Sequence, residues 1–294
     1  MITVIINPIS GTGGRIDIAR RRAEHARALL ALHGMGGEVH LTEGAGHARE
    51  LARHALARHA STILAWGGDG TVNEVASEIA YRDAALGIIP SGSGNGLARE
   101  LQIPFDPDAA FDIALHGTER VIDAGEFDGR LFFNIAGIGL DARVAHRFSE
   151  DGLVRRGFRR YLEITASELW SFHPDEHTIV TDGATVRRRA LLIAIANARQ
   201  YGNGATIAPR ARLDDGRLDV VVVEHRSPLR ALMHMPRVFM GQIERIPGVT
   251  MTTAVDIEVT SAQPVIYHVD GEPFVGGASL KARVRPRALR VRVK

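Results

Sequence analysis

The first 121 residues repeat one pattern, in which a short apolar run ends at a turn and is followed by a stretch with helical spacing of apolar residues. Runs of strand length lie at 3–7, 39–41, 62–66 and 86–89, and helical spacing lies at 17–32, 47–59 and 72–80. Short apolar strands that alternate with helices are typical of a parallel sheet covered on both faces. The pattern predicts an α/β fold with a doubly wound parallel sheet.

Beyond residue 121 the strand-like runs follow one another with few regular helices between them. They lie at 131–135, 178–181, 190–196, 218–223, 256–260, 265–269 and 288–293, and one helical stretch covers 158–170. This pattern predicts a mainly antiparallel β domain. We expect two domains, 1–125 and 126–294, and the sequence leaves open to which of them residues 288–294 belong.

Composition excludes several classes of protein. The chain has no cysteine, which removes disulfide frameworks, cysteine zinc sites and thiol nucleophiles. No apolar stretch reaches the roughly 18 residues of a membrane-spanning helix, and no basic segment precedes the first apolar run. A net charge of +2 gives only a weak overall field. We therefore expect a cytoplasmic protein without a nucleic-acid partner.

The strongest motif is Gly67-Gly68-Asp69-Gly70-Thr71-Val72-Asn73-Glu74, between the run 62–66 and a helical stretch. Glycines allow backbone N–H groups to approach a phosphate closely, and the start of a helix attracts an anion. An acid among these glycines fits a phosphate site if a cation or its bound water lies between them. The alternative for Thr71 and Glu74 is a capping box that only begins the helix.

Two more glycine-rich turns end strand-like runs. They are Asn7-Pro8-Ile9-Ser10-Gly11 and Pro90-Ser91-Gly92-Ser93-Gly94-Asn95-Gly96-Leu97. The carboxyl ends of parallel strands form the edge at which such sheets bind ligands. Neither turn has the spacing of a P-loop or of a dinucleotide-binding fingerprint. The three turns together predict an anion site at this edge.

A fourth motif, Asp270-Gly271-Glu272, follows the run 265–269. Two carboxylates that flank a glycine at a strand end can serve as a base and as a metal partner. The alternative is a hairpin turn, for which Asp-Gly is a common sequence.

Taken in this order, the motifs resemble the diacylglycerol kinase catalytic family, in particular its soluble bacterial lipid kinases and their sphingosine kinase relatives. Ile122-Asp123 and the stretches 133–142 and 201–219 extend the resemblance over nearly the whole chain. The Gly-Gly-Asp-Gly core alone is shared with NAD kinases and phosphofructokinases.

The resemblance implies an ATP- and Mg²⁺-dependent kinase that phosphorylates the hydroxyl of a diacylglycerol-like or sphingoid lipid. It implies that the nucleotide binds in a cleft between the α/β domain and a β-sandwich domain for the lipid. The nucleotide-binding residues that it implies are Asn7, Ser10, Gly11, Arg15, Thr42, Gly67, Gly68, Asp69, Gly70, Thr71, Val72, Asn73, Ser93, Gly94 and Asn95.

The same resemblance implies that Asp270 is the general base and that Asp69, Asp123 and Glu272 organise Mg²⁺ and water. It also implies a second, structural magnesium site. Asp215 matches this site, and backbone oxygens of Arg212 and Arg217 would complete it.

One residue departs from the family pattern: many bacterial members have Asp where this chain has Gly96, and the phrase around it is closer to the sphingosine kinase pattern. Gly96 gives one alternative, a catalytically silent lipid- or nucleotide-binding protein. The shared Gly-Gly-Asp-Gly core gives the other, an NAD kinase-like enzyme for a soluble substrate.

The lipid substrate implies contact with a membrane, and we expect it at the inner membrane surface. The candidate docking element is the helical stretch 158–170 with Phe158, Trp170, Phe172 and the arginines Arg155, Arg156, Arg159 and Arg160. The alternative is a helix that only packs on the β domain. A homodimer is compatible with the sequence.

Overall fold

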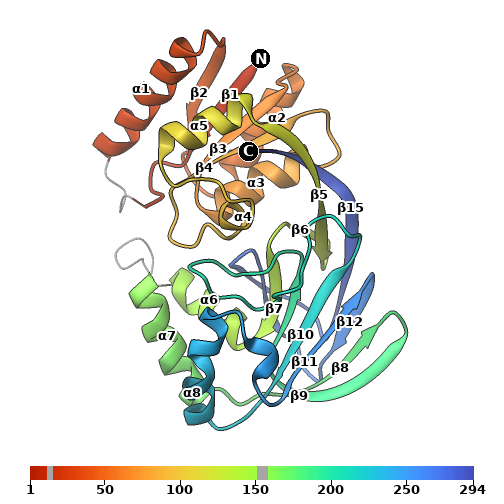
Figure 1. Ribbon diagram of the computed structural model, residues 1–294. Helices are drawn as coiled ribbons and strands as arrows, with labels where there is room; N and C mark the ends of the chain where they lie inside the picture. The colour runs from red at the N-terminus through yellow and green to blue at the C-terminus, as the bar shows by residue number, and fades with distance from the viewer. Residues whose placement is uncertain (12–15, 151–157) are drawn as a thin grey trace. The chain divides into compact units, whose positions relative to one another are not determined.

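The computed structural model describes residues 1–11, 16–150 and 158–294 (Figure 1). The chain forms two compact units, the first from Met1–Ile122 with Arg287–Lys294 and the second from Asp123–Pro286. Strands β5 (Thr118–Phe127) and β15 (Ser279–Val293) each run from one unit into the other. The last residues, whose placement the sequence leaves open, therefore belong to the first unit, although the expected division 126–294 included them in the second.

The first unit contains a parallel sheet in the order β2-β1-β3-β4-β15. Its strands are β1 (Ile2–Ile6), β2 (Gly37–Leu41), β3 (Thr62–Gly67) and β4 (Ala85–Pro90), and its helices are α1 (Ile16–Leu32), α2 (His47–Ala57), α3 (Asp69–Ile79), α4 (Gly96–Glu100) and α5 (Pro107–His116). Strands β1, β3 and β4 are buried at every position, which explains their apolar sequences. The predicted α/β fold is confirmed.

The second unit contains two antiparallel sheets that share one long strand, β9 (Ala184–Ala196). The first half of β9 pairs with β8, and its second half pairs with β7 and β10. The other elements are β6 (Arg130–Phe132), β7 (Ile135–Gly139), α6 (Leu140–Glu150), α7 (Phe158–Ser171), β8 (Glu176–Thr181), β10 (Leu218–Glu224), α8 (Pro228–Phe239), the 3₁₀ helix η1 (Ile243–Arg245), β11 (Val249–Ala254), β12 (Asp256–Thr260), β13 (Ile266–Val269) and β14 (Glu272–Val275). One sheet has the order β6-β5-β15-β12-β8-β9 and the other β11-β10-β9-β7-β13-β14.

The core of the second unit shows the two-residue period of a β-strand. Ile193 and Ile195 of β9 pack with Leu280 of β15 in the cluster between the sheets. Ala194 lies in a different cluster, with Val221 of β10. Two sheets packed face to face confirm the expected mainly antiparallel β-sandwich.

The predicted strand 131–135 is divided in the structure. Strand β6 ends at Phe132 and β7 begins at Ile135, because the backbone N–H groups of residues 133–135 donate to the carboxylate of Asp270 instead of following one regular strand. The predicted helix 158–170 is present as α7. Among the described residues, no helix is both long enough and apolar enough to cross a bilayer.

Candidate functional site

In the first unit, the turns that follow β1 and β4 touch each other. The Oγ of Ser91 lies 3.2 Å from the Oγ of Ser10 and donates to it. Gly11 has φ of +67°, and a Cβ at this position would lie 2.1 Å from the carbonyl oxygen of Ser91. Glycine is therefore required here both by the backbone conformation and by the contact with the neighbouring turn.

The turn that follows β3 packs against the same structure. A Cβ at Gly92 would lie 2.6 Å from the Cα of Gly68, so the two backbones are in direct contact. The side chain of Asn95 closes the turn after β4, because its Oδ1 accepts from the Gly92 N–H at 2.9 Å and its Nδ2 donates to the Gly92 carbonyl at 2.6 Å. All three glycine-rich turns thus meet at one edge of the parallel sheet, as the sequence predicts.

Asp69 connects two of these turns. Its carboxylate accepts the backbone N–H of Asn95 at 2.8 Å and that of Gly96 at 2.7 Å, at the start of α4. Asp69 is also the first residue of the eleven-residue helix α3. The first turn of a helix has N–H groups without intrahelical partners, and here they belong to residues of the Gly-Gly-Asp-Gly motif. Gly70 and Ser93 are exposed, so the edge is open at these two residues.

The alternative for Thr71 and Glu74, a capping box that begins the helix, is wrong. Helix α3 already begins at Asp69, and its N-cap residue is Gly68, which has no side chain to cap it. The carboxylate of Glu74 accepts the backbone N–H groups of Gly46 at 2.9 Å and Ala48 at 3.0 Å, so it stabilises the start of α2. The Oγ1 of Thr71 accepts from Asn7 Nδ2 at 2.9 Å and joins the turns after β1 and β3.

The other predicted nucleotide-binding residues of the first unit occupy different environments. Thr42 is buried just after β2, and its N–H donates to the carbonyl of Ile6 at 2.9 Å. The side chain of Val72 is in the core. Asn73 accepts from Ser77 Oγ at 3.2 Å. Arg15 lies outside the described residues.

In the second unit, Asp270 and Gly271 form the turn between β13 and β14. Their φ angles are +47° and +85°, which is typical of a tight hairpin, so the hairpin alternative is correct for the backbone. The carboxylate of Asp270 accepts the N–H groups of Phe133, Asn134 and Ile135, each at 3.0 Å. Glu272 is the first residue of β14 and is exposed.

A buried polar network, which sequence reasoning missed, supports this turn. Gly271 N–H donates to Nδ1 of His268 at 3.3 Å, so this nitrogen is the acceptor and Nε2 carries the proton. Nε2 lies 3.2 Å from Oδ2 of Asp141, which also accepts the Tyr201 hydroxyl at 2.8 Å. Burial, followed by the charge of Asp141, raises the pKa of Tyr201 well above its usual value, so the phenol remains a donor. A Cβ at Gly137 would lie 2.3 Å from Asp141 Oδ2, so only glycine leaves room for the network.

Asp123 contacts the loop 213–217. Its N–H donates to the carbonyl of Leu213 at 2.6 Å, and its carboxylate accepts the N–H of Gly216 at 2.7 Å. Asp123 is 2% exposed, and Asn197 Nδ2 donates to its carbonyl oxygen. The structure thus brings Asp123 together with the loop that contains Asp215.

The loop 213–217 contains the second predicted metal site, and its acidic groups fit a cation. Asp219, which sequence reasoning missed, is buried; burial, and then the charge of Asp215, raises its pKa to about 6. Nearby carboxylates that repel each other are stabilised by a hard cation such as Mg²⁺. The guanidinium of Arg217 bonds to Asp182 and Thr253, and that of Arg212 lies near Asp214, so only backbone oxygens of these two arginines suit a metal.

Two family descriptions match the chain. Residues 1–127 match the diacylglycerol kinase catalytic domain, and residues 134–293 match the YegS C-terminal NAD kinase beta sandwich-like domain. A probable lipid kinase YegS-like of Pseudomonas aeruginosa is 33% identical over 91% of this chain and 89% of its own length. A diacylglycerol kinase of Mycobacterium tuberculosis is 31% identical over 99% of this chain and 94% of its own length.

Solved structures show the same fold. A putative diacylglycerol kinase from Bacillus anthracis superposes with a TM-score of 0.80 at 20% identity, over 100% of this chain and 95% of its own. An NAD kinase from Archaeoglobus fulgidus in complex with ATP gives a TM-score of 0.56 at 13% identity, over 99% of this chain and 93% of its own.

Proposed function

Because this chain belongs to the family of YegS-like lipid kinases and diacylglycerol kinases, we propose that it transfers the γ-phosphoryl group of ATP to the hydroxyl of a lipid alcohol. The acceptor is a diacylglycerol-like or sphingoid lipid. In this reaction the hydroxyl oxygen forms a new O–P bond, the bond between the β- and γ-phosphates breaks, ADP leaves, and the hydroxyl proton passes to a base. The observation that carries the proposal is the junction of three glycine-rich turns with Asp69 at one edge of the parallel sheet.

The first unit supplies the phosphate site. Phosphoryl transfer depends mainly on positioning and charge stabilisation, and backbone N–H groups at the start of a helix provide both. The N–H groups of Gly70 and Thr71, in the first turn of α3, are suited to the phosphates. Mg²⁺, when bound with ATP, neutralises phosphate charge, and Asp69 is the acid at this edge that would hold the ion or its water.

The second unit supplies the base. Asp270 is held in one orientation because its carboxylate accepts three backbone N–H groups, and its hairpin is fixed in turn by His268. In this proposal the fixed carboxylate orients the hydroxyl and receives its proton as the O–P bond forms. Gly96 removes one acid of the family pattern, and its N–H instead binds Asp69.

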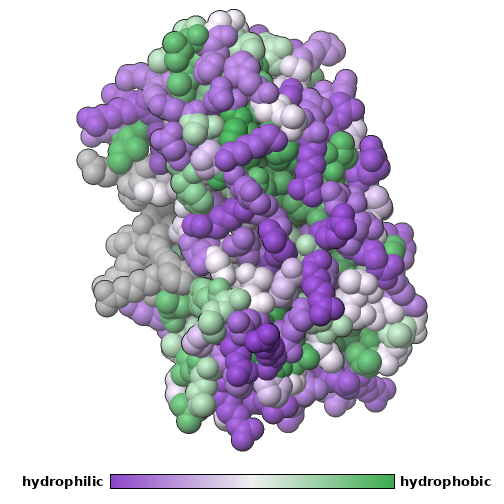
Figure 2. Space-filling model, viewed as in Figure 1, coloured by the Kyte–Doolittle hydropathy of each residue, from purple (hydrophilic) through white to green (hydrophobic). Residues whose placement is uncertain are grey.

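Exposed apolar side chains support a lipid rather than a soluble acceptor. Leu229 and Met233 of α8 are 60% and 69% exposed, and Trp170 of α7 is 62% exposed. Figure 2 shows apolar surface in the region of these helices. Arg230 and Arg237 lie on the same α8 helix, and an amphipathic helix with cations is suited to an anionic membrane surface. Of the predicted docking arginines, Arg155 and Arg156 lie outside the described residues, and Arg160 pairs with Glu163. We therefore infer peripheral contact of a cytoplasmic enzyme through α7 and α8.

The test is a transfer assay with ATP labelled in its γ-phosphate. The acceptors are a diacylglycerol, a sphingoid base and NAD, each with and without Mg²⁺. We expect Mg²⁺-dependent labelling of one lipid and none of NAD, and loss of labelling in Asp69→Ala. Labelling of NAD alone would replace this proposal with a soluble-substrate kinase, and no labelling of any lipid alcohol would favour a silent binding protein.

A vesicle assay tests the membrane contact separately. Replacing Leu229 and Met233 with serine should reduce co-sedimentation with vesicles that contain phosphatidylglycerol. The matched control is Val275→Ser, because Val275 is 74% exposed but lies on β14. Equal co-sedimentation of all three proteins would exclude α8 as the contact.

A further inference from the structure

Helices α1 and α5 of the first unit are joined by two pairs of side chains. His25 of α1 bonds to Asp108 of α5 through Nε2. His33, just after the end of α1, bonds through Nδ1 to Nε2 of His116 at 3.0 Å. Each member of the second pair lies eight residues after its counterpart in the first pair. The two helices therefore run in the same direction where they meet.

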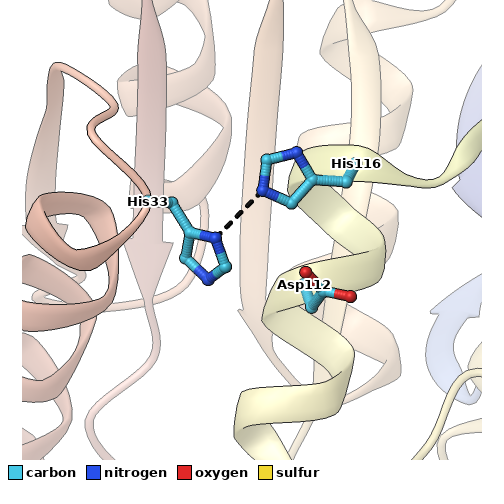
Figure 3. Close-up of side chains that lie close together, drawn as sticks. All are labelled: His33, Asp112 and His116. Carbon is cyan, nitrogen blue, oxygen red and sulfur yellow. Dashed lines mark hydrogen bonds between the residues drawn. The ribbon is translucent and has the colours of Figure 1, made fainter.

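A carboxylate accompanies the second pair. Asp112 precedes His116 by one helical turn, and residues four apart lie on the same face of a helix. The ligand atoms of His33, Asp112 and His116 lie within 4.8 Å of one another (Figure 3). Figure 3 also shows the two imidazole rings turned toward each other from different elements. Among the described residues, none forms an ion pair with Asp112.

Both backbone segments that supply these side chains are well anchored. The N–H of His33 donates to the carbonyl of Leu29 at 3.0 Å, and that of Gly34 donates to the carbonyl of Ala31. Helix α5 begins at Pro107 after Asp106, whose carboxylate caps it by accepting from Ala109 N–H at 3.0 Å. A ligand could therefore bind with little rearrangement of the backbone.

The distances suit a transition metal. Two histidine nitrogens at about 2.0–2.1 Å from a tetrahedral Zn²⁺ lie about 3.3 Å apart, so the two rings need to separate by only about 0.3 Å. The carboxylate would be the third ligand, and water would fill the fourth position. Two imidazoles and one carboxylate favour Zn²⁺, Ni²⁺ or Cu²⁺ over Mg²⁺ and Ca²⁺, which prefer oxygen ligands.

We propose that His33, Asp112 and His116 bind one divalent transition-metal ion of the zinc class, which fastens the end of α1 to α5. The site is separate from the phosphate site, because α1 has 17 residues and therefore places His33 roughly 25 Å from the beginning of the helix, which follows the Ser10–Gly11 turn. Its role is to stabilise the first unit, and it does not depend on the proposed kinase activity.

Titration calorimetry of the untagged, metal-free full chain tests this site. We expect wild type to bind one equivalent of Zn²⁺ at this site and to bind Mg²⁺ there not at all. His33→Ala, His116→Ala and Asp112→Asn should each weaken Zn²⁺ binding by about tenfold or more. His25→Ala is the matched control, because it also removes a contact between α1 and α5, and it should bind Zn²⁺ as wild type does.

Two further measurements identify the atoms that bind Zn²⁺ and the effect of Zn²⁺ on thermal stability. On addition of Zn²⁺, the ring-nitrogen NMR signals of His33 Nδ1 and His116 Nε2 should shift, and the thermal unfolding midpoint should rise in wild type and in His25→Ala only. Because Asp112 and His116 are exposed, Asp112→Asn and His116→Ala are expected to fold even if His33→Ala does not. Unchanged Zn²⁺ affinity in both of these variants, or loss of binding in His25→Ala to the same extent, would overturn the proposal.

Discussion

Three hairpins of the second unit turn at Asp-Gly with nearly the same backbone, and in two of them the aspartate accepts backbone N–H groups. Asp182-Gly183 joins β8 to β9, and Asp270-Gly271 joins β13 to β14; the aspartate has φ of +47° in both. Both carboxylates also accept backbone N–H groups from another segment, Asp182 from Val255 and Asp256 and Asp270 from residues 133–135. The turn geometry alone therefore does not distinguish a structural aspartate from the proposed base.

The two turns differ in the residues that hold them in place. The Asp182 turn is exposed, and its carboxylate also binds the guanidinium of Arg217. The Asp270 turn is held by His268, which is 2% exposed and bonded to Asp141. A buried polar network lowers stability unless all its members are bonded. Its presence at the Asp270 turn, and not at the Asp182 turn, indicates that Asp270 must be held in a fixed position. The buried contacts that hold the turn in place, rather than the sequence Asp-Gly, therefore indicate its function.

The largest expected effect separates the two aspartates. Asp270→Asn should lower kcat for lipid phosphorylation by about 10²–10⁴-fold, because the amide cannot accept the hydroxyl proton. Asp182→Asn, in which Oδ1 keeps both N–H bonds, should leave kcat within about twofold. Steady-state rates, with thermal unfolding as the check of folding, measure both variants. Equal rates in Asp270→Asn and wild type would remove Asp270 from this role.

A smaller loss of kcat is expected when His268, which bonds to the Asp270 turn, is replaced. His268→Ala should lower kcat by about 10–100-fold with little change in KM for ATP, because the Gly271 N–H loses its acceptor and the turn is less well positioned. His268→Asn, whose Oδ1 can replace Nδ1, should recover more activity than His268→Gln. Val180→Ala is the control, because Val180 precedes Asp182 as His268 precedes Asp270. Similar losses in all three His268 variants with equal loss of stability would indicate a purely structural histidine.

Asp219, whose pKa is raised, should change stability with pH in the opposite direction to a carboxylate whose pKa is lowered by N–H donors. The pKa of Asp219 is raised to about 6, so the folded state binds a proton more tightly than the unfolded chain does. Stability should then fall as pH rises from about 4 to 6, by up to about 3 kcal/mol. Urea unfolding should show this loss in wild type, and Asp219→Asn should abolish it.

The same experiment tests the predicted metal loop. Mg²⁺ should restore stability to wild type at pH 7 and should have little effect on Asp219→Asn or Asp215→Asn, because these variants lack one carboxylate of the pair. A stability gain from Mg²⁺ that is equal in all three proteins would place the ion elsewhere.

The smallest effect concerns Asp182. Its backbone N–H partners, and to a lesser extent Arg217, lower its pKa, so its contribution to stability is present above the usual pKa of an aspartate and is lost as pH falls through the lowered value. Wild type should therefore lose slightly more stability than Asp182→Asn below about pH 4. Because Asp182 is exposed, the difference should be small, and identical acid unfolding curves would show that the N–H bonds contribute nothing.

Local patterns predicted much of the fold. The strands β1, β3 and β4 were predicted because a strand buried on both faces is a continuous apolar run. Helix α7 was predicted because a helix with one buried face has apolar residues at helical spacing. Helix α8 was missed; it contains Pro236, and none of its residues is fully buried. The three glycine-rich turns were predicted to meet because the carboxyl ends of parallel strands lie at the same edge of a sheet.

Long-range partners could not be predicted. Glu74 caps a helix that begins 27 residues earlier, where the sequence offered a local capping box with Thr71. The bonds of Asp141 to Tyr201 and His268 join positions 60 and 127 residues apart, and no local pattern indicates them. Asp219 was missed because its importance arises from burial and from its neighbour Asp215.

The most direct test of the account is a titration of wild type and Asp270→Asn with Mg²⁺ and ATP, in which the backbone amide NMR signals of Gly68, Gly70 and Ser93 are followed together with labelled phosphate transfer to the lipid. We expect the same amide shifts and an ATP affinity within about twofold in both proteins, with transfer only in wild type. Amide shifts confined to other parts of the chain, or equal transfer by both proteins, would contradict it.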